Sequence, residues 1–427
     1  MHNLNFLYQF GKDIHGFYSY YYELFRRMHD SGVKLSIITL VNFLKDYEDI
    51  NSFSVYKVGF YRKKPEINPL RWLNKLIRPP SNTRLMAKMA LKVHEKHPID
   101  VMNAFHSTDC GLAATYVKAK TKIPVIFNPI SGLRHLFLRP PQLRNFPRFR
   151  NLIKKSSIID RSFTELYNIF EKRYFQRFPV ILKQSDLIVV PSNASKRDVL
   201  YFGADPEKII KVPFAVDINE FSPKNMPHKD LERLKERKSP LLLFVGRLSI
   251  TEKAVDEVLK AFKLIRKAFP DAGLVIVGDG PDKNILIHLS YALGLTGSVF
   301  FLGSKKHSEI PNILSAADAL LFPFRLDSVG LTADTFGRVI IEGMSCGKVV
   351  ITTNAEPFKE IVENNKDGFL VNPNDYRGLA EVACKVLSDE FQKKSIEKNA
   401  RRKVIEHYRF PVIIKELKKT YKQVIGS

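Results

Sequence analysis

Two cationic side chains follow a short apolar run in the C-terminal half of the chain. Arg247 comes after Val245 and Gly246, and Lys253 lies six positions further on. An Arg and a Lys held at the end of a strand can bind two phosphates, the Arg through its planar guanidinium and the Lys as a point charge. The alternative is that both are ordinary surface residues, since Arg and Lys are mostly exposed in proteins. The spacing of Arg247 and Lys253 therefore supports the hypothesis of a diphosphate site.

Two carboxylates, those of Asp334 and Glu342, lie eight positions apart on either side of Phe336 and Gly337. If a helix starts near Gly337, one carboxylate precedes it and the other lies about two turns along one face. Glu342 could then accept hydrogen bonds from ribose hydroxyls. Asp334, together with Phe336, could contact a donor sugar. The alternative is a capped helix, with Asp334 or Thr335 as the cap and Glu342 in solvent.

The start of this helix would also present backbone amides that have no partner within the helix. The amides concerned are those of Gly337, Arg338 and Val339. A helix N-terminus attracts anions, because its free N–H groups and its dipole both favour negative charge. We therefore expect these amides to bind the same diphosphate as Arg247 and Lys253.

Short apolar runs on both sides of these residues are typical of strands buried on two faces. They cover residues 35–39, 125–127, 187–190, 241–245, 274–277 and 349–352. Segments with a helical period lie between them, such as the one beginning at Ala254, whose apolar residues form one stripe. This alternation predicts an α/β fold, with two doubly wound parallel sheets covered by helices.

The domain boundary is expected where prolines and charges interrupt the alternation of strand and helix. We predict an N-terminal domain over 1–220, a linker over 221–239 and a C-terminal domain over 240–410. A last helix within 411–427 is expected to pack back on the N-terminal domain. A chain of 427 residues is long enough for two such domains.

Cysteine content and hydropathy restrict the class of protein. The three cysteines, Cys110, Cys346 and Cys384, are far apart and odd in number, so they suggest neither a disulfide framework nor a paired-cysteine metal site. No Asp-x-Asp metal motif, secretory signal or apolar stretch of membrane-spanning length is recognisable. We expect a cytoplasmic protein that needs neither a metal nor a cofactor.

The net charge of +24 predicts affinity for polyanions. Residues 133–178 contain eleven Lys or Arg against three acidic residues, interleaved with Phe and Tyr. Such a segment suits an anionic membrane surface, where cations meet head groups and rings enter the interface. It would also suit nucleic acid, on whose bases rings can stack, although we favour nucleic acid least. The alternative is that the rings pack under helices and the charges are solvated.

Taken together, the C-terminal motifs resemble those of the retaining GT-B glycosyltransferases of family 4, a group 1 glycosyltransferase family. The resemblance covers nearly all of the C-terminal half and, more weakly, the N-terminal half. Its motifs are Val245-Gly-Arg-Leu248 with Lys253, Leu274-Val-Ile-Val-Gly-Asp-Gly-Pro281, Val299-Phe-Phe-Leu-Gly303, Ala316-Ala-Asp-Ala-Leu-Leu-Phe-Pro323, the acidic pair with Phe336-Gly337, Gly343-Met-Ser-Cys-Gly347 and Asp367-Gly-Phe-Leu-Val-Asn-Pro373. Their joint order and spacing are specific, whereas each motif alone is weak.

The resemblance implies two Rossmann-like lobes facing across a cleft, with a nucleotide sugar held chiefly by the C-terminal lobe and the acceptor chiefly by the other. By the same resemblance, Arg247 and Lys253 neutralise the donor diphosphate and Glu342 binds the ribose. Asp334 stands where the family's first Glu contacts the donor sugar. Transfer would retain the anomeric configuration.

The sequence departs from the family pattern at several positions. Asp334 replaces a Glu, which shortens the side chain by one methylene. The early Gly-Gly turn reads His15-Gly16, so that Gly16 alone can give close backbone approach to the diphosphate. His106 resembles a family histidine and is a candidate catalytic residue beside Asp334, although a packed, hydrogen-bonded His is the alternative. Asn128 follows the strand where the family often has a His.

The sequence thus predicts a glycosyltransferase that moves a sugar, as a hexosyltransferase would, from a nucleotide diphosphate donor to a lipid-linked or polysaccharide acceptor. Two alternatives remain open at this point. One is a binding or scaffold protein that kept the fold and lost transfer. The other is a glycosyltransferase that acts on nucleic acid, which rests on analogy of fold alone.

Overall fold

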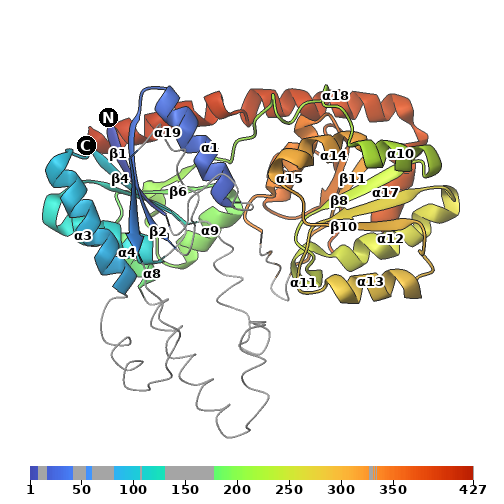
Figure 1. Cartoon of the computed structure of the whole chain (residues 1–427), viewed down its shortest axis with the longest axis horizontal. Helices are drawn as coiled ribbons and strands as arrows, with labels where there is room; N and C mark the ends of the chain where they lie inside the picture. The colour runs from blue at the N-terminus through green and yellow to red at the C-terminus, as the bar shows by residue number, and fades with distance from the viewer. Residues whose placement is uncertain are drawn as a thin grey trace, which may run out of the picture. The chain divides into compact units, whose positions relative to one another are not determined.

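The computed structural model describes residues 1–7, 17–41, 54–59, 81–105, 108–129, 177–326, 330, 332 and 334–426. The chain forms two compact units, each built on its own parallel sheet (Figure 1). Unit 1 comprises residues 1–190, 195–211 and 417–427. Unit 2 comprises residues 191–194 and 212–416.

Unit 1 contains a seven-stranded sheet in the order β3-β2-β1-β4-β5-β6-β7, in which every pair of neighbours is parallel. The strands are β1 (His2–Leu7), β2 (Lys34–Val41), β3 (Ser54–Gly59), β4 (Val101–Phe105), β5 (Val125–Asn128), β6 (Leu187–Val190) and β7 (Ile209–Lys211). The helices are α1 (Phe17–Asp30), α3 (Ser81–Lys96), α4 (Thr108–Thr121), α8 (Phe178–Gln184) and α9 (Asn193–Tyr201). The 3-10 helix η2 (Pro206–Lys208) precedes β7.

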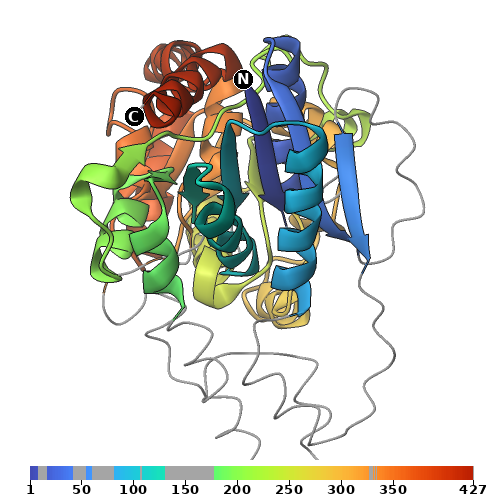
Figure 2. The ribbon, with the colours of Figure 1, turned by 90° about the vertical axis from the view of Figure 1, so that its left-hand side faces the viewer.

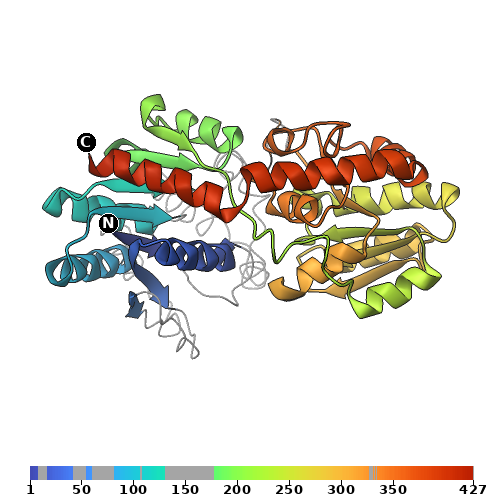
Figure 3. The same ribbon diagram turned by 90° about the horizontal axis from the view of Figure 1, so that it is seen from above.

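The two faces of the unit 1 sheet are covered differently. Leu4 and Phe6 of β1 belong to a core cluster with residues of α3, α4 and α8. Figure 2 shows these helices beside the sheet. Asn3 and Asn5 alternate with Leu4 and Phe6 and point to the other face, as the two-residue period of a strand requires. There α1 lies beside α19 (Phe410–Ile425), as Figure 3 shows. Tyr421 of α19 is fully buried and interacts with Asn3. Residues 417–427 therefore complete unit 1.

Unit 2 contains a six-stranded parallel sheet in the order β10-β9-β8-β11-β12-β13. The strands are β8 (Leu241–Val245), β9 (Gly273–Val277), β10 (Val299–Gly303), β11 (Ala319–Phe322), β12 (Val350–Thr353) and β13 (Phe369–Val371). The helices are α10 (Lys229–Arg237), α11 (Ile250–Lys253), α12 (Val255–Ala268), α13 (Lys283–Ala292), α14 (Ile310–Ala316), α15 (Arg338–Ser345), α16 (Phe358–Ile361), α17 (Tyr376–Ser388) and α18 (Glu390–His407), with the 3-10 helix η3 (His307–Glu309) before α14. Helix α12 packs on α17, and α15 packs on α18.

The predicted fold class, two Rossmann-like parallel-sheet domains, is confirmed. The stretch expected as a linker, 221–239, contains helix α10, and unit 2 already begins at Val212. Helix α10 forms there because Leu231 is buried and Lys235 bonds Asp318 at 2.7 Å. Acidic residues in its first turn and basic residues in its last turn also favour a helix over a linker.

The basic and aromatic segment 133–178 lies outside the described residues, except for Arg177 and the start of α8. Within the described part of the chain, no helix is both long and apolar enough to pass through a bilayer. The same residues contain no group of three or more His, Cys, Asp or Glu arranged to hold a metal ion.

Candidate functional site

Arg247 lies in a tight loop that follows β8. The loop is fixed by backbone hydrogen bonds to the neighbouring turn after β9, from Gly246 N–H to Val277 O at 2.9 Å and from Leu248 N–H to Asp279 O at 3.0 Å. Gly278 closes this contact with φ +137°, and a Cβ there would lie 1.8 Å from the Gly246 oxygen. Only glycine fits at this approach.

The fixed loop presents the Arg247 side chain to solvent. Its side chain is 61% exposed, and its guanidinium lies 3.8 Å from the Glu252 carboxylate. Such an exposed, loosely paired guanidinium is open to a ligand anion. Arg247 therefore follows the end of β8, as we predicted. Its role in binding phosphate stays a prediction.

Lys253 is the last residue of the short helix α11. The next residue, Ala254, has φ +46° and ψ 38° and joins α11 to α12. Lys253 forms an ion pair with Asp334. Its ammonium also lies over the ring of Phe324, 4.4 Å from the centroid, as a cation–π contact. The structure thus brings together two residues that are far apart in the sequence.

Besides its ion pair with Lys253, Asp334 accepts hydrogen bonds from the backbone. Its Oδ1 accepts hydrogen bonds from the amides of Phe336 at 3.0 Å and Gly337 at 2.7 Å. Burial by itself would raise the pKa of Asp334, but the Lys253 ammonium and the two amides outweigh burial and hold the pKa of the carboxyl below its ordinary value. We expected the Gly337 amide to bind diphosphate, but it donates its hydrogen bond to Asp334 instead. The short Asp side chain can reach this amide because it stands only three residues earlier in the chain.

Helix α15 begins at Arg338, directly after Gly337, as the sequence predicted. Gly337 has φ +82°, and a Cβ there would lie 3.0 Å from Ile340 and 3.1 Å from the Phe358 ring. Arg338 reaches one turn along the helix and bonds Glu342 at 3.0 Å. Glu342 is buried, at 7% exposed, which excludes the alternative of a solvated carboxylate.

The turn that carries Asp334 is held from several sides. Phe336 is buried with its ring edge-on to Phe214, at 5.3 Å between centroids. The Ser192 hydroxyl donates to the Thr335 carbonyl at 2.7 Å. These contacts fix the backbone ahead of α15, so the position of Asp334 is set by the fold of unit 2.

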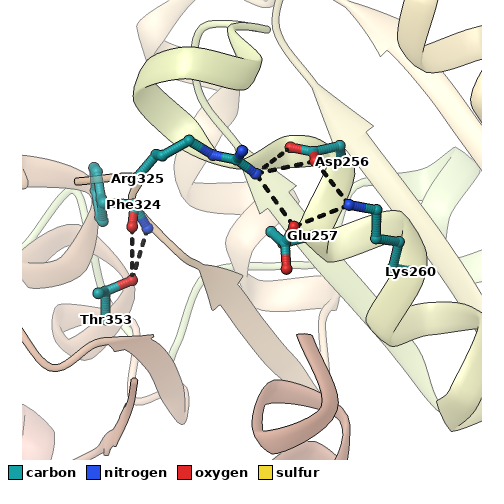
Figure 4. Close-up of polar contacts among 6 residues, drawn as sticks. All are labelled: Asp256, Glu257, Lys260, Phe324, Arg325 and Thr353. Atoms are coloured by element: carbon teal, nitrogen blue, oxygen red, sulfur yellow. Dashed lines mark hydrogen bonds and ion pairs between the residues drawn. The ribbon is translucent and has the colours of Figure 1, made fainter. Parts of the chain in front are cut away.

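Sequence reasoning missed three residues beside this site (Figure 4). The backbone N–H of Phe324 donates to Thr353 Oγ1 at 2.8 Å, and the same hydroxyl donates to the Phe324 carbonyl at 3.1 Å. Arg325 bonds Asp256 and Glu257 at the start of α12. No local motif marks these residues, because their partners are remote in the sequence.

A histidine beside Glu342 was also missed. His307 packs its ring against Phe221, at 5.4 Å between centroids. Burial lowers the pKa of His307, Arg338 acts in the same direction, and Glu342 opposes both. A neutral imidazole next to a buried Arg–Glu pair offers both a donor and an acceptor to a polar ligand.

The remaining predicted site residues, Gly16 and His106, lie outside the described residues. Their proposed roles stay predictions. The described site accordingly belongs to unit 2 alone, where it consists of Arg247, Lys253, Asp334 and the first turns of α15.

Two family models match this chain. The model described as Glycosyltransferase Family 4 matches residues 15–220, and the model described as Glycosyl transferases group 1 matches residues 228–403. The chain belongs to the group 1, family 4 glycosyltransferases. The sequence-based recognition is thereby confirmed, and the two matched ranges include all the candidate site residues.

Individual relatives of this glycosyltransferase are identical to it at about a quarter of the aligned positions. It is 26% identical over 266 residues to N-acetyl-alpha-D-glucosaminyl L-malate synthase of Bacillus anthracis, which covers 57% of this chain and 67% of that protein. It is 28% identical over 209 residues to a GDP-mannose-dependent alpha-(1-6)-phosphatidylinositol monomannoside mannosyltransferase of Mycobacterium tuberculosis, covering 48% and 54%. The glycosyltransferase thus spans about half to two thirds of the length of these relatives.

Solved structures match over almost the whole glycosyltransferase. Anabaena HepE, crystallised in complex with UDP and glucose, superposes with a TM-score of 0.70 at 17% identity, covering 99% of this chain and 100% of that one. At this identity the likeness shows the fold, which is GT-B.

In a glycosyltransferase, cations that face the departing group lower the cost of the negative charge that develops there. Unit 2 offers Arg247 and Lys253 as such cations, and Asp334 joins Lys253 to the turn before α15. It also offers Asp334 and Glu342 as hydrogen-bond acceptors for hydroxyl groups. The arrangement can bind an anionic, hydroxyl-rich molecule.

Proposed function

We propose that this glycosyltransferase moves a hexose from a nucleotide diphosphate sugar to a lipid-linked or polysaccharide acceptor, with retention of anomeric configuration. The single observation that carries the proposal is the convergence in unit 2 of Lys253, Asp334 and the start of α15. Cations, helix amides and a carboxylate in one place are the groups that a diphosphate joined to a sugar requires.

The proposed binding assigns one task to each group. Arg247 and Lys253 neutralise the diphosphate, and the amides of Arg338 and Val339 complete its coordination. Glu342, held by Arg338, accepts hydrogen bonds from the ribose. Because Lys253 already pairs with Asp334, it can hold this carboxylate toward the sugar while its remaining N–H groups face phosphate.

In the proposed reaction the bond between the anomeric carbon and the diphosphate oxygen breaks while the acceptor oxygen bonds to the same carbon. The acceptor proton passes to the leaving phosphate oxygen. Asp334 is proposed as a catalytic residue that contacts the sugar, together with His106, and Gly16 as a further contact of the diphosphate. Arg247 and Lys253 can stabilise the leaving charge, so a metal ion is not needed in this scheme.

The acceptor proposal rests on chemistry and on relatives. One relative is named for action on a phosphatidylinositol mannoside, which is a lipid. The segment 133–178 combines an excess of positive charge with aromatic residues, a composition suited to anionic lipid. We propose that the protein acts in the cytoplasm at the surface of a membrane.

The test is transfer or hydrolysis measured with a panel of nucleotide sugars in the presence of EDTA. We expect turnover with at least one donor, and a loss of roughly 100-fold or more on Arg247→Ala or Glu342→Ala, since each removes an interaction with the donor. Arg233→Ala, an exposed arginine on α10, is the matched control and should leave turnover unchanged. Absence of turnover with intact nucleotide binding would indicate a binding protein instead.

A further inference from the structure

Arg325 is the centre of a charged cluster beside the candidate diphosphate site (Figure 4). Its Nη2 lies 3.0 Å from both carboxylate oxygens of Asp256 and 3.2 Å from Glu257 Oε1. Lys260 bonds the same two carboxylates at 3.1 and 3.0 Å. Both carboxylates are buried, and burying two charges is costly unless they are paired. The cluster is balanced, with two cations and two anions.

The cluster holds the chain on both sides of Lys253. The backbone N–H of Arg325 donates to the carbonyl of Glu252, the residue just before Lys253, at 3.2 Å. The guanidinium of Arg325 bonds Asp256 and Glu257, which come three and four residues after Lys253. One residue therefore fixes both the end of α11 and the start of α12.

The neighbour of Arg325 supports the Lys253 ammonium directly. Phe324 lies under it at 4.4 Å, and the Phe324 ring stacks on Phe358 with 3.8 Å between centroids. The Phe324 backbone is anchored at both its N–H and its carbonyl by Thr353. Phe324 contacts the Lys253 ammonium, and Arg325 bonds the residue before Lys253.

We propose that Arg325 is a positioning residue for diphosphate binding, which acts by fixing the Lys253 ammonium through Glu252, Asp256 and Glu257. This inference rests on the function proposed above. Arg325 contacts neither phosphate nor sugar in this scheme. Its role is to hold the turn between α11 and α12 in the one arrangement that presents Lys253.

The proposal predicts which part of the donor is affected. Replacing Arg325 by Met should weaken binding of a nucleoside diphosphate and leave binding of the matching nucleoside unchanged, because only the diphosphate meets Lys253. We expect a loss of about tenfold to 100-fold in diphosphate affinity, the range that a misplacement of about 1 Å in a positioned site can cause. A general weakening of the fold would reduce both affinities.

The experiment is a double-mutant cycle on the full chain, with isothermal titration calorimetry of UDP, GDP and ADP and of their nucleosides. The proteins are wild type, Arg325→Met, Lys253→Ala and the double variant. If Arg325 acts through Lys253, the first substitution has no further effect once Lys253 is Ala. Equal losses from Arg325→Met in both backgrounds would overturn the proposal. Absence of diphosphate binding by the wild type is a separate outcome, which would overturn the proposed function.

Two further variants separate positioning from folding. The triple variant Arg325→Met, Asp256→Asn, Glu257→Gln removes the charges that Arg325 leaves unpaired, so its free energy of unfolding should recover relative to Arg325→Met. Its diphosphate affinity should stay low, and a recovery of affinity together with stability would contradict the proposal. Arg325→Lys keeps the charge and should restore part of the affinity. Arg402→Met, on the exposed side of α18, is the matched control and should behave as wild type.

Discussion

The hydrogen bonds of Asp334 give a structural reason for an Asp where the resemblance to the family leads us to expect a Glu. Its carboxylate accepts hydrogen bonds from the amides of Phe336 and Gly337, which come two and three residues later in the chain. Asp and Asn make such local bonds because their side chains are short. A Glu at position 334 would place its oxygens beyond these amides. The shorter residue therefore builds the turn before α15 and pairs with Lys253 at the same time, as part of the local structure.

The pH dependence of stability should report the Asp334–Lys253 pair. Because the pKa of folded Asp334 lies below its unfolded value of about 4, the pair stabilises the fold above pH ~4, and this contribution is lost as the pH falls through the folded pKa. We predict that wild type is more stable than Asp334→Asn at pH 7 and that the difference shrinks below pH ~4. Urea unfolding of both proteins between pH 3 and pH 7 measures this, and a difference that is constant with pH would contradict it.

Gly337 should be intolerant of a side chain. Its φ of +82° is strained for other residues, and a Cβ would press on Ile340 and Phe358. Gly294 is the matched control, since its φ of +73° carries the same strain but a Cβ there meets nothing within 4 Å. We expect Gly294→Ala to cost about 1–2 kcal/mol and Gly337→Ala about 1–3 kcal/mol more, measured as free energies of unfolding in urea. Equal costs would show that packing around Gly337 is loose.

At the scale of elements, the junction of α11 and α12 contains a residue in an unfavourable conformation. Ala254 has φ +46°, in the left-handed region that costs about 1–2 kcal/mol for a residue other than glycine. A glycine would remove this cost but lose about 0.5–1 kcal/mol through chain entropy. We predict that Ala254→Gly raises the free energy of unfolding by up to about 1 kcal/mol, as measured by thermal melting of both proteins. A clear loss of stability would indicate that the Ala254 methyl group is needed in the core.

Elements with uniform apolar sequences were predictable, and those with buried polar residues were not. The runs at 187–190 and 241–245 coincide with β6 and β8. Strand β1 escaped prediction because Asn3 and Asn5 break its apolar run, although both are fully buried. At the site, the start of α15 followed from local sequence. The Lys253–Asp334 pair and the Arg325 cluster join residues far apart in the chain, so only the fold reveals them.

At the scale of the whole molecule, the end of α19 should contribute strongly to the stability of unit 1, although it is far from the rest of that unit in the sequence. Tyr421 is 1% exposed and packs on the face of the sheet that carries Asn3 and Asn103. We predict that Tyr421→Ala lowers the free energy of unfolding by about 3–5 kcal/mol, because a large buried ring leaves a cavity. Ile425→Ala, at a position 41% exposed, is the control and should cost far less. Urea unfolding followed by circular dichroism measures both.

The assignment of residues 417–427 to unit 1 also sets the order in which the protein can mature on the ribosome. The strands of unit 1 are synthesised first, yet the face with Asn3 and Asn5 is covered only in part, by α1, until α19 has been made. Unit 2, whose chain is continuous from residue 212 to 416, can complete its own core beforehand. A nascent chain that pauses before residue 417 would carry a finished second half and an unfinished first half. Such a chain would expose the part of the sheet face that α19 covers once residues 417–427 have been added.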